Sequence, residues 1–175
     1  MSDLSHTTGT APGPDDAPVR FGVIGAGFIA RWFAEAVARE PAAQIVAVTS
    51  ARRERAVAFA EERRIPHARA SLEEMLAAHG PGSASPIDVV YVGSPNSLHA
   101  EHAITALEAG FHVLVEKPFA LTTVQARAMV DAAGRADRFL MEGWLSAFEP
   151  GVARLREHLP RLGQLHRVVL SKEQF

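Results

Sequence analysis

Apolar, β-branched segments alternate along most of the chain with segments of helical periodicity. Strands are expected at residues 19–24, 44–49, 65–68, 87–92, 111–115 and 139–141. Helices are expected between them at residues 28–39, 53–64, 72–79, 98–108 and 123–136. This alternation predicts an α/β fold, a doubly wound parallel sheet of the Rossmann dinucleotide-binding type with right-handed crossovers. Ligands of such sheets bind at the carboxyl ends of the strands.

Capping residues mark the ends of several predicted helices. Ser71 is an N-cap residue, with Glu74 at the capping-box position. Thr122 or Thr123 begins the helix that runs to about residue 136, and Gly110 ends the helix before it in the C′ position. These caps support the boundaries that the periodicity predicts.

The two ends of the chain fall outside the alternation. Residues 1–18 are rich in Gly, Pro, Asp, Ser and Thr and are expected to be a disordered tail. Residues 19–145 are the predicted dinucleotide-binding domain. Residues 146–175 are predicted to hold a connecting helix, 150–159, and a strand, 165–170, that begins a second, truncated α+β domain. The length suits one domain with a real core, but not two full domains.

Composition and charge exclude several classes of protein. Hydrophobic residues make up 47% of the chain and charged residues 22%, and the net charge of -2 gives no basic excess for nucleic acid. The lack of cysteine excludes disulfides, thiolate catalysis and Cys-ligated metals, and fits a reducing, cytoplasmic compartment. No apolar run is long enough for a membrane span, and no metal site or secretory signal is expected.

The residues GAGFIA at 25–30 follow the first predicted strand and open a helix. Gly25 suits a tight turn, and Gly27 leaves room for a phosphate to approach the backbone. The amides of Phe28 and Ile29 lie at the positive end of the helix dipole, where they are expected to bind that phosphate. These four residues are predicted to bind a dinucleotide. The alternative is a strand-to-helix turn with only a structural role.

The end of the second predicted strand distinguishes NAD from NADP. An Asp or Glu there would bond the ribose 2′-hydroxyl of NAD, but the chain has Ser50, Arg52 and Arg53. A hydroxyl and two guanidinium groups suit the 2′-phosphate of NADP. These residues are predicted to bind the cofactor, with NADP preferred and NAD left open. Alternatively, the two arginines form a solvated first turn of the next helix.

The fourth predicted strand ends in Ser94, Pro95 and Asn96, which are expected beside the cofactor. The Asn96 side-chain amide could hydrogen-bond a ribose or the carboxamide of the cofactor. The alternative is that Asn96 or Ser97 is the N-cap residue of the next helix, and neither role excludes the other. His99 lies in the first turn of that helix. It is a candidate cofactor contact, although a lone histidine there more often has a structural role.

Lys117 follows the fifth predicted strand and is the first choice for a catalytic residue. A lysine at a strand end can donate or accept a proton when partial burial and a cationic nicotinamide ring favour its neutral form. Glu116 either pairs with it or points elsewhere, and Pro118 fixes the turn, with a cis peptide bond as one form. The alternative is a surface lysine near a turn.

Three stretches together carry a family resemblance: GVIGAGFIA at 22–30, SPNSLHAEHAITALEAGFHVLVEKPFALT at 94–122 and MEGWLSAFEP at 141–150. They resemble the glucose-fructose oxidoreductase and inositol dehydrogenase family of NAD(P)-dependent oxidoreductases, over about residues 19–175. The resemblance implies that Lys117 helps to move the proton of a substrate hydroxyl as hydride passes to or from the nicotinamide. It also implies a cofactor site lined by Gly25, Gly27, Ser50, Arg52, Ser94, Pro95, Asn96 and Glu116.

The chain departs from this family in two places. Residues 146–150 read Ser-Ala-Phe-Glu-Pro where many members have an aromatic residue or Arg followed by Arg-Phe-His-Pro, which leaves the substrate class more open. Typical members also continue for well over a hundred residues as an antiparallel sheet that supplies an Asp and a His to the site. The isolated chain is therefore expected to be inactive, as a fragment or a natural truncation.

The leading interpretation is the N-terminal part of an oxidoreductase that acts on a sugar, polyol or related secondary alcohol or ketone. A rival from another class is a non-catalytic nucleotide-binding module, which the short chain favours and the intact Gly25, Gly27 and Lys117 oppose. A semialdehyde or dipicolinate-type reductase is a weaker rival, because the Glu-Lys-Pro context at 116–118 argues against it. The expected partner is a small-molecule substrate, and a homo-oligomer stays open.

Overall fold

The structure, a computed structural model of the chain, describes residues 17–169 and 171. The chain divides into two compact units, one ending at Gly143 and one beginning at Trp144. Most of the predicted tail, residues 1–16, lies outside the described residues. Among the helices that the structure describes, none has the length and apolar character needed to cross a membrane.

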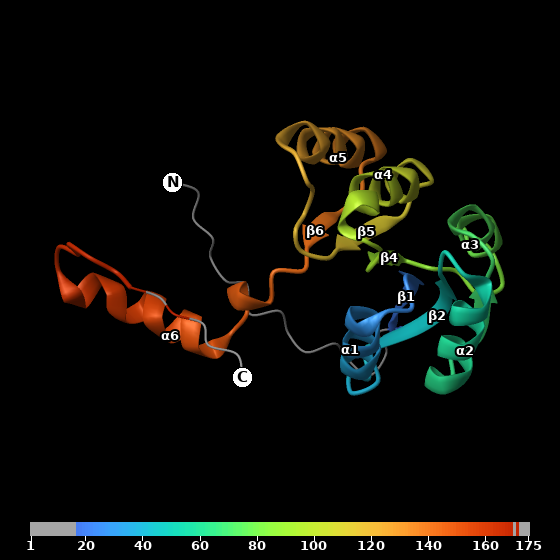
Figure 1. Ribbon diagram of the computed structural model, residues 1–175, viewed down its shortest axis with the longest axis horizontal. Helices are drawn as coiled ribbons and strands as arrows, with labels where there is room; N and C mark the ends of the chain where they lie inside the picture. The colour runs from blue at the N-terminus through green and yellow to red at the C-terminus, as the bar shows by residue number, and fades with distance from the viewer. Residues whose placement is uncertain (1–16, 170, 172–175) are drawn as a thin grey trace. The chain divides into compact units, whose positions relative to one another are not determined.

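The first unit is built on one six-stranded sheet in the order β3-β2-β1-β4-β5-β6 (Figure 1). Its strands are β1 (Val19–Ile24), β2 (Ala43–Thr49), β3 (His67–Arg69), β4 (Val89–Val92), β5 (His112–Val115) and β6 (Leu140–Glu142). Its helices are α1 (Phe28–Val37), α2 (Arg53–Arg63), α3 (Leu72–Ala78), α4 (His99–Glu108) and α5 (Thr123–Ala136), with a 3-10 turn, η1 (Asn96–Leu98), before α4. All neighbouring strands are parallel, which confirms the predicted doubly wound sheet.

Helices cover both faces of this sheet (Figure 1). Val23 and Ile24 are adjacent in β1 but enter different apolar clusters, because successive side chains of a strand point to opposite faces. The cluster with Val23 includes Phe59 of α2, and the cluster with Ile24 includes Leu107 of α4 and Met129 of α5. Helix α2, before β3, packs on one face of the sheet, and α3, after β3, packs on the other. The chain then returns to place β4 beside β1, so the switch point of the sheet lies between the carboxyl ends of these two strands.

The predicted caps of α3 and α5 are confirmed. Ser71 Oγ accepts a hydrogen bond from the Glu74 amide at 3.2 Å, and the Glu74 carboxylate accepts one from the Ala70 amide at 2.8 Å. At α5 it is Thr122 that caps, since its hydroxyl accepts from the Gln125 amide at 3.2 Å. The Glu74 and Gln125 amides lie in the first turns of their helices and have no partner within them, so the two side-chain caps satisfy these amides.

The start of α4 differs from the prediction. Neither Asn96 nor Ser97 caps this helix; both lie in η1, and the N-cap residue is Leu98, whose side chain makes no cap hydrogen bond. The 3-10 turn takes up the residues that were expected to cap, so the α-helix begins at His99. The C-terminal end agrees with the prediction, because Gly110 follows the helix with φ of +87°.

Four strands begin later than predicted, β3 and β4 by two residues and β5 and β6 by one. Ile65 was expected in the third strand, but its amide donates to the Ala60 carbonyl at 2.8 Å and closes α2, after Arg64 with φ of +55°. Phe139 was expected in the sixth strand, but its side chain is 73% exposed and β6 begins at Leu140. The shift brings Glu142 into β6, beside the end of β5.

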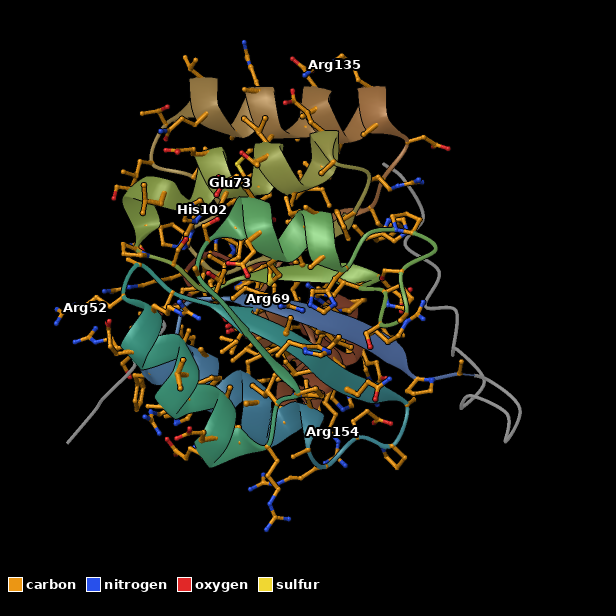
Figure 2. The ribbon with its side chains drawn as sticks, turned by 90° about the vertical axis from the view of Figure 1, so that its right-hand side faces the viewer. Arg52, Arg69, Glu73, His102, Arg135 and Arg154 are labelled. Atoms are coloured by element: carbon orange, nitrogen blue, oxygen red, sulfur yellow. The ribbon has the colours of Figure 1, made fainter. Side chains whose placement is uncertain are left out.

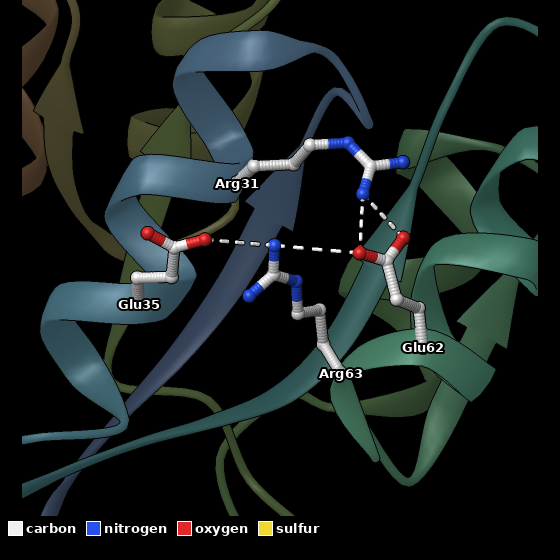
Figure 3. Close-up of polar contacts among 4 residues, drawn as sticks. All are labelled: Arg31, Glu35, Glu62 and Arg63. Atoms are coloured by element: carbon white, nitrogen blue, oxygen red, sulfur yellow. Dashed lines mark hydrogen bonds and ion pairs between the residues drawn. The ribbon is translucent and has the colours of Figure 1, made fainter.

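Two arginine–glutamate pairs join α1 to α2 (Figure 3). Arg31 donates to both carboxylate oxygens of Glu62. Arg63 Nη2 lies 3.0 Å from Glu35 Oε1 and 3.4 Å from Glu62 Oε1. Partly exposed pairs stabilise a fold only weakly when alone, but these four charges form one network between two helices on the same face of the sheet.

Arg20 and Asp88 form a bidentate pair at the amino ends of β1 and β4. The guanidinium Nη2 lies 2.5 Å from Oδ1, and Nε and the Arg20 amide each donate to Oδ2 at 2.9 Å. The hydrogen bond from Arg20 is the main cause that holds the pKa of Asp88 below its ordinary value of 3.8. A depressed folded-state pKa means that the ionised carboxylate stabilises the fold above pH 3.8 and that this contribution is lost as the pH falls through the folded-state pKa.

Asp88→Asn is therefore expected to lower the melting temperature more at pH 7 than at about pH 3, because the wild-type protein begins to lose the same contribution as the pH falls toward the depressed folded-state pKa of Asp88. Thermal unfolding of both proteins at the two pH values measures this difference. An equal loss at both pH values would show that the ionised carboxylate is not what stabilises the fold.

The second unit contains η2 (Leu145–Ala147), α6 (Pro150–His158) and η3 (Leu159–Leu162). Helix α6 confirms that a helix forms where residues 150–159 predicted one, with proline at its first position, where a missing amide hydrogen costs nothing. The strand predicted at 165–170 is not formed over residues 165–169, and residue 170 lies outside the described residues. A strand needs a neighbour for its backbone groups, and no described strand pairs with this segment.

Candidate cofactor site

A cleft of about 550 Å³ lies at the carboxyl ends of β1, β2 and β4, at the switch point of the sheet. Its walls come from the glycine turn after β1, the turn after β2 with the start of α2, the start of α3, and the turn after β4 with η1 and α4. The lining residues are Ile24, Gly25, Ala26, Gly27, Thr49, Ser50, Ala51, Arg55, Ala70, Ser71, Leu72, Glu73, Gly93, Ser94, Pro95, Leu98 and His102. Five predicted site residues are among them: Gly25, Gly27, Ser50, Ser94 and Pro95.

The two glycines of the turn have different physical roles. Gly25 has φ of +109°, and a Cβ there would lie 2.5 Å from the Gly93 carbonyl oxygen, so this position requires glycine to fold. Gly27 has an extended backbone, and a Cβ there would meet no atom within 4 Å. The first glycine fits the turn against the neighbouring strand. The second leaves open space at the N-terminus of α1, where an anion is favoured.

The turn after β2 places its arginines differently from the prediction. Ser50 lines the cleft, but Arg52 and Arg53 do not. Arg52 is the N-cap residue of α2, with an extended backbone, and Figure 2 shows it at the outer rim of the molecule. Arg55, in the first turn of α2, lines the cleft instead. The signal in the sequence for Arg55 was weak: it is one more arginine in the first turn of the helix that follows the end of β2.

Glu73 and His102 line the cleft from α3 and α4 (Figure 2), and neither is among the site residues predicted from the sequence. His102 Nδ1 lies 2.9 Å from Ser94 Oγ. Desolvation lowers the pKa of His102 and outweighs the carboxylates of Glu101 and Glu73, which raise it, so the ring is neutral at pH 7. The signal for His102 was its position three residues after His99, one helical turn further along α4.

Lys117 is exposed in the turn after β5, so the partial burial expected for it is not present. The carboxylate beside it points elsewhere: Glu116 Oε1 accepts a hydrogen bond from the Tyr91 hydroxyl at 2.7 Å, and Oε2 accepts one from the Lys117 amide at 3.2 Å. Burial and this carboxylate strongly raise the pKa of Tyr91, which therefore stays a donor. Glu116 thus connects the turn that carries Lys117, here called the lysine turn, to β4.

Two further contacts hold the turn. The Phe119 amide donates to Glu142 Oε1 of β6 at 2.9 Å. The Pro118 carbonyl lies 2.9 Å from Nδ1 of His99. The peptide bond before Pro118 is cis, which is one of the forms that the sequence allowed. The backbone that carries Lys117 is thereby tied to the strand on each side of β5 and to α4.

The remaining predicted cofactor contacts lie outside the lining of the cleft. Phe28 and Ile29 begin α1 next to Gly27, with amides that a helix leaves without partners. Asn96 is exposed in η1, and His99 is buried beneath the turn after β4. Cofactor contacts by these residues and by Glu116 remain predictions.

A larger cavity, of about 650 Å³, lies at the opposite end of the sheet. Its walls come from the end of α1, the start of β2 and the end of α2, and include Glu35 and Arg63. No predicted site residue lines it. Size alone therefore does not identify the functional site of this fold; the position at the carboxyl ends of the strands does.

Comparison with known proteins agrees with this geometry. The chain is 37% identical over 157 residues to scyllo-inositol 2-dehydrogenase (NADP(+)) of Bacillus subtilis, covering 90% of this chain and 46% of that protein. It is 36% identical over 157 residues to D-glucoside 3-dehydrogenase of Escherichia coli, covering 86% of this chain and 42% of that protein. The chain thus spans less than half the length of these curated relatives.

Among solved structures, the WlbA dehydrogenase of Bordetella pertussis, in complex with NADH and UDP-GlcNAcA, superimposes with a TM-score of 0.75 at 26% identity. The match covers 83% of this chain and 40% of that one. The model of the oxidoreductase family with an NAD-binding Rossmann fold matches residues 19–144, which include the glycine turn, the cleft and Lys117. The chain therefore belongs to this family of NAD(P)-dependent oxidoreductases, and the described cleft lies in its NAD-binding domain.

Proposed function

We propose that the chain binds NADP in the described cleft and forms the cofactor-binding part of an enzyme that oxidises or reduces a sugar, a polyol or a related secondary alcohol or ketone. The observation that carries this proposal is the open space at Gly27, at the N-terminus of α1 and the switch point of the sheet. The named activities of the relatives, on an inositol and a glucoside, support the substrate class.

The residues of the cleft suit a dinucleotide. Gly25, Gly27 and the first-turn amides of Phe28 and Ile29 would hold the pyrophosphate, because they combine open space with unpaired donors. A ribose would lie near the turn after β2, as in other Rossmann folds. When bound, NADP supplies the nicotinamide ring as the acceptor or donor of hydride.

The end of β5 supports a proton-transfer role for Lys117. The side chain is exposed beside the carboxyl ends of the strands, and the turn that carries it is fixed by side chains of Tyr91, His99 and Glu142. In alcohol oxidation Lys117 would take the hydroxyl proton, and in ketone reduction it would return that proton to the oxygen. A fixed backbone and a free ammonium or amine end suit this role.

Arg55 takes the place of Arg52 and Arg53 as the cation expected to select NADP. It lines the same cleft as Ser50, so its guanidinium and the Ser50 hydroxyl are the groups placed to bind a ribose 2′-phosphate. Membership of the oxidoreductase family does not favour the non-catalytic module that the sequence left open. A cytoplasmic location and the lack of a nucleic-acid partner stay part of the proposal, as expected from composition.

Arg55→Ala is expected to weaken NADPH binding by about 10-fold to 100-fold, the loss expected for a hydrogen bond between charged groups, and to change NADH binding less than about twofold. The matched control is the double variant Arg52→Ala/Arg53→Ala, which removes two positive charges outside the cleft and should leave the preference for NADPH nearly unchanged. Fluorescence titration with both cofactors measures these affinities. Unchanged NADPH affinity in Arg55→Ala would contradict this assignment.

A further inference from the structure

His99 is a buried histidine whose two ring nitrogens both face backbone carbonyl oxygens. It is the first residue of α4 and is only 1% exposed. Nδ1 lies 2.9 Å from the Pro118 carbonyl oxygen, and Nε2 lies 3.0 Å from the Ser94 carbonyl oxygen. Both distances are those of hydrogen bonds, and a carbonyl oxygen can only accept.

This geometry bears on the protonation of the ring. A neutral imidazole carries one N–H, so its second nitrogen would turn a lone pair toward a carbonyl oxygen in a site without water access. An imidazolium carries two N–H groups and satisfies both carbonyls. The positive end of the α4 dipole disfavours a cation at this position, so the two carbonyls must supply the stabilisation.

Titratable groups lie on the elements around His99. Carboxylates come from Glu101 of α4 itself and from Glu73 of α3, and both act on the neighbouring His102. On the side of the lysine turn, Glu116 is bonded to Tyr91 and Lys117 follows it.

The two carbonyls belong to the two turns that matter for the proposed function. Ser94 lines the cofactor cleft after β4, and Pro118 follows Lys117 after β5. We propose that His99 is a positioning residue: an imidazolium that donates from both ring nitrogens and holds the cofactor turn at Ser94 at a fixed distance from the turn that carries Lys117. The role of this contact in catalysis rests on the proposed function. The donation of hydrogen bonds from both ring nitrogens of His99 does not depend on it.

The direct test is nitrogen-15 NMR of the 175-residue chain, with labelled histidine and no cofactor, at neutral pH. His99 is expected to show two protonated ring nitrogens, and its signals are assigned by their loss in His99→Gln. The neutral His102 is the internal reference for a ring with one protonated nitrogen. One protonated and one bare nitrogen at His99 would overturn the proposal, whether or not the chain binds NADPH.

The positioning role is tested by amide hydrogen exchange in His99→Gln. A glutamine side chain offers donors from one nitrogen only, so it cannot hold both turns, and exchange of the Lys117 and Phe119 amides is expected to accelerate by about tenfold or more. His79→Gln is the matched control. His79 is also 1% exposed and its Nδ1 lies 2.7 Å from the Ser85 carbonyl oxygen, but it contacts neither turn.

The control should leave these two amides within about twofold of the wild type. Equal acceleration in both variants would mean that loss of any buried histidine loosens the unit, and this would overturn a specific positioning role. Unchanged exchange in His99→Gln would overturn it as well. If His99→Gln does not fold, the His99 ring signals are assigned through bonds from the His99 backbone amide of the wild type, and that spectrum decides between one donor and two.

Discussion

Gly27→Val is expected to abolish measurable NADPH binding, with a loss of affinity of at least about 100-fold, while the chain stays folded. The added methyl groups would enter space that no protein atom occupies, so they displace the pyrophosphate and not a neighbouring side chain. The backbone at Gly27 is extended, with φ of -94° and ψ of -170°, which valine adopts without strain. Its place as the N-cap residue of α1 limits the expected loss of stability to about 1 kcal/mol.

Gly25→Ala is the matched comparison. A single methyl there would meet the Gly93 carbonyl oxygen at 2.5 Å on a backbone with φ of +109°, so this variant is expected to lose stability and cofactor binding together. Circular dichroism and NADPH fluorescence, recorded on both variants, separate the two effects. Retained NADPH affinity in Gly27→Val would show that the second glycine has only a structural role.

Lys117→Ala, in a form of the protein that includes a substrate domain, is expected to lower kcat by about 10² to 10⁴, the range for loss of a positioned acid or base. NADPH affinity should change little, because Lys117 lies outside the cofactor cleft. Lys117→Arg is the informative control, since it keeps the positive charge but cannot release a proton. It should be as slow as the alanine variant. Steady-state kinetics and NADPH titration measure the two quantities.

A near wild-type rate in Lys117→Ala would show that Lys117 makes only a surface contact and does not transfer the proton. A normal rate in Lys117→Arg, with a slow alanine variant, would instead indicate that Lys117 acts through its charge. The two variants thus distinguish proton transfer from electrostatic stabilisation at the end of β5.

The sheet and its ligand-binding edge could be predicted because they depend on local patterns. Alternating strands and helices specify a parallel doubly wound sheet, and the glycine turn specifies the point at which it binds an anion. The separate roles of Gly25 and Gly27 followed from the motif, and the structure shows them as a close contact at one glycine and open space at the other.

Other features depended on contacts between distant segments, which a linear pattern does not contain. Arg55 rather than Arg52 lines the cleft because α2 begins at residue 53 and turns Arg52 outward. The double contact of His99 needs the ends of β4 and β5 to be adjacent and α4 to begin after a 3-10 turn. Apolar residues at 165–169 suggested a strand, but a strand forms only where a partner supplies hydrogen bonds.

Amide hydrogen exchange of the 175-residue chain, recorded with and without NADPH, tests most directly whether the cleft at the carboxyl ends of β1, β2 and β4 binds NADP. Saturable binding with protection concentrated at residues 24–27, 49–55 and 93–98 is the predicted result. No saturable binding, or protection centred on the larger cavity around Glu35 and Arg63 at the opposite end of the sheet, would contradict it.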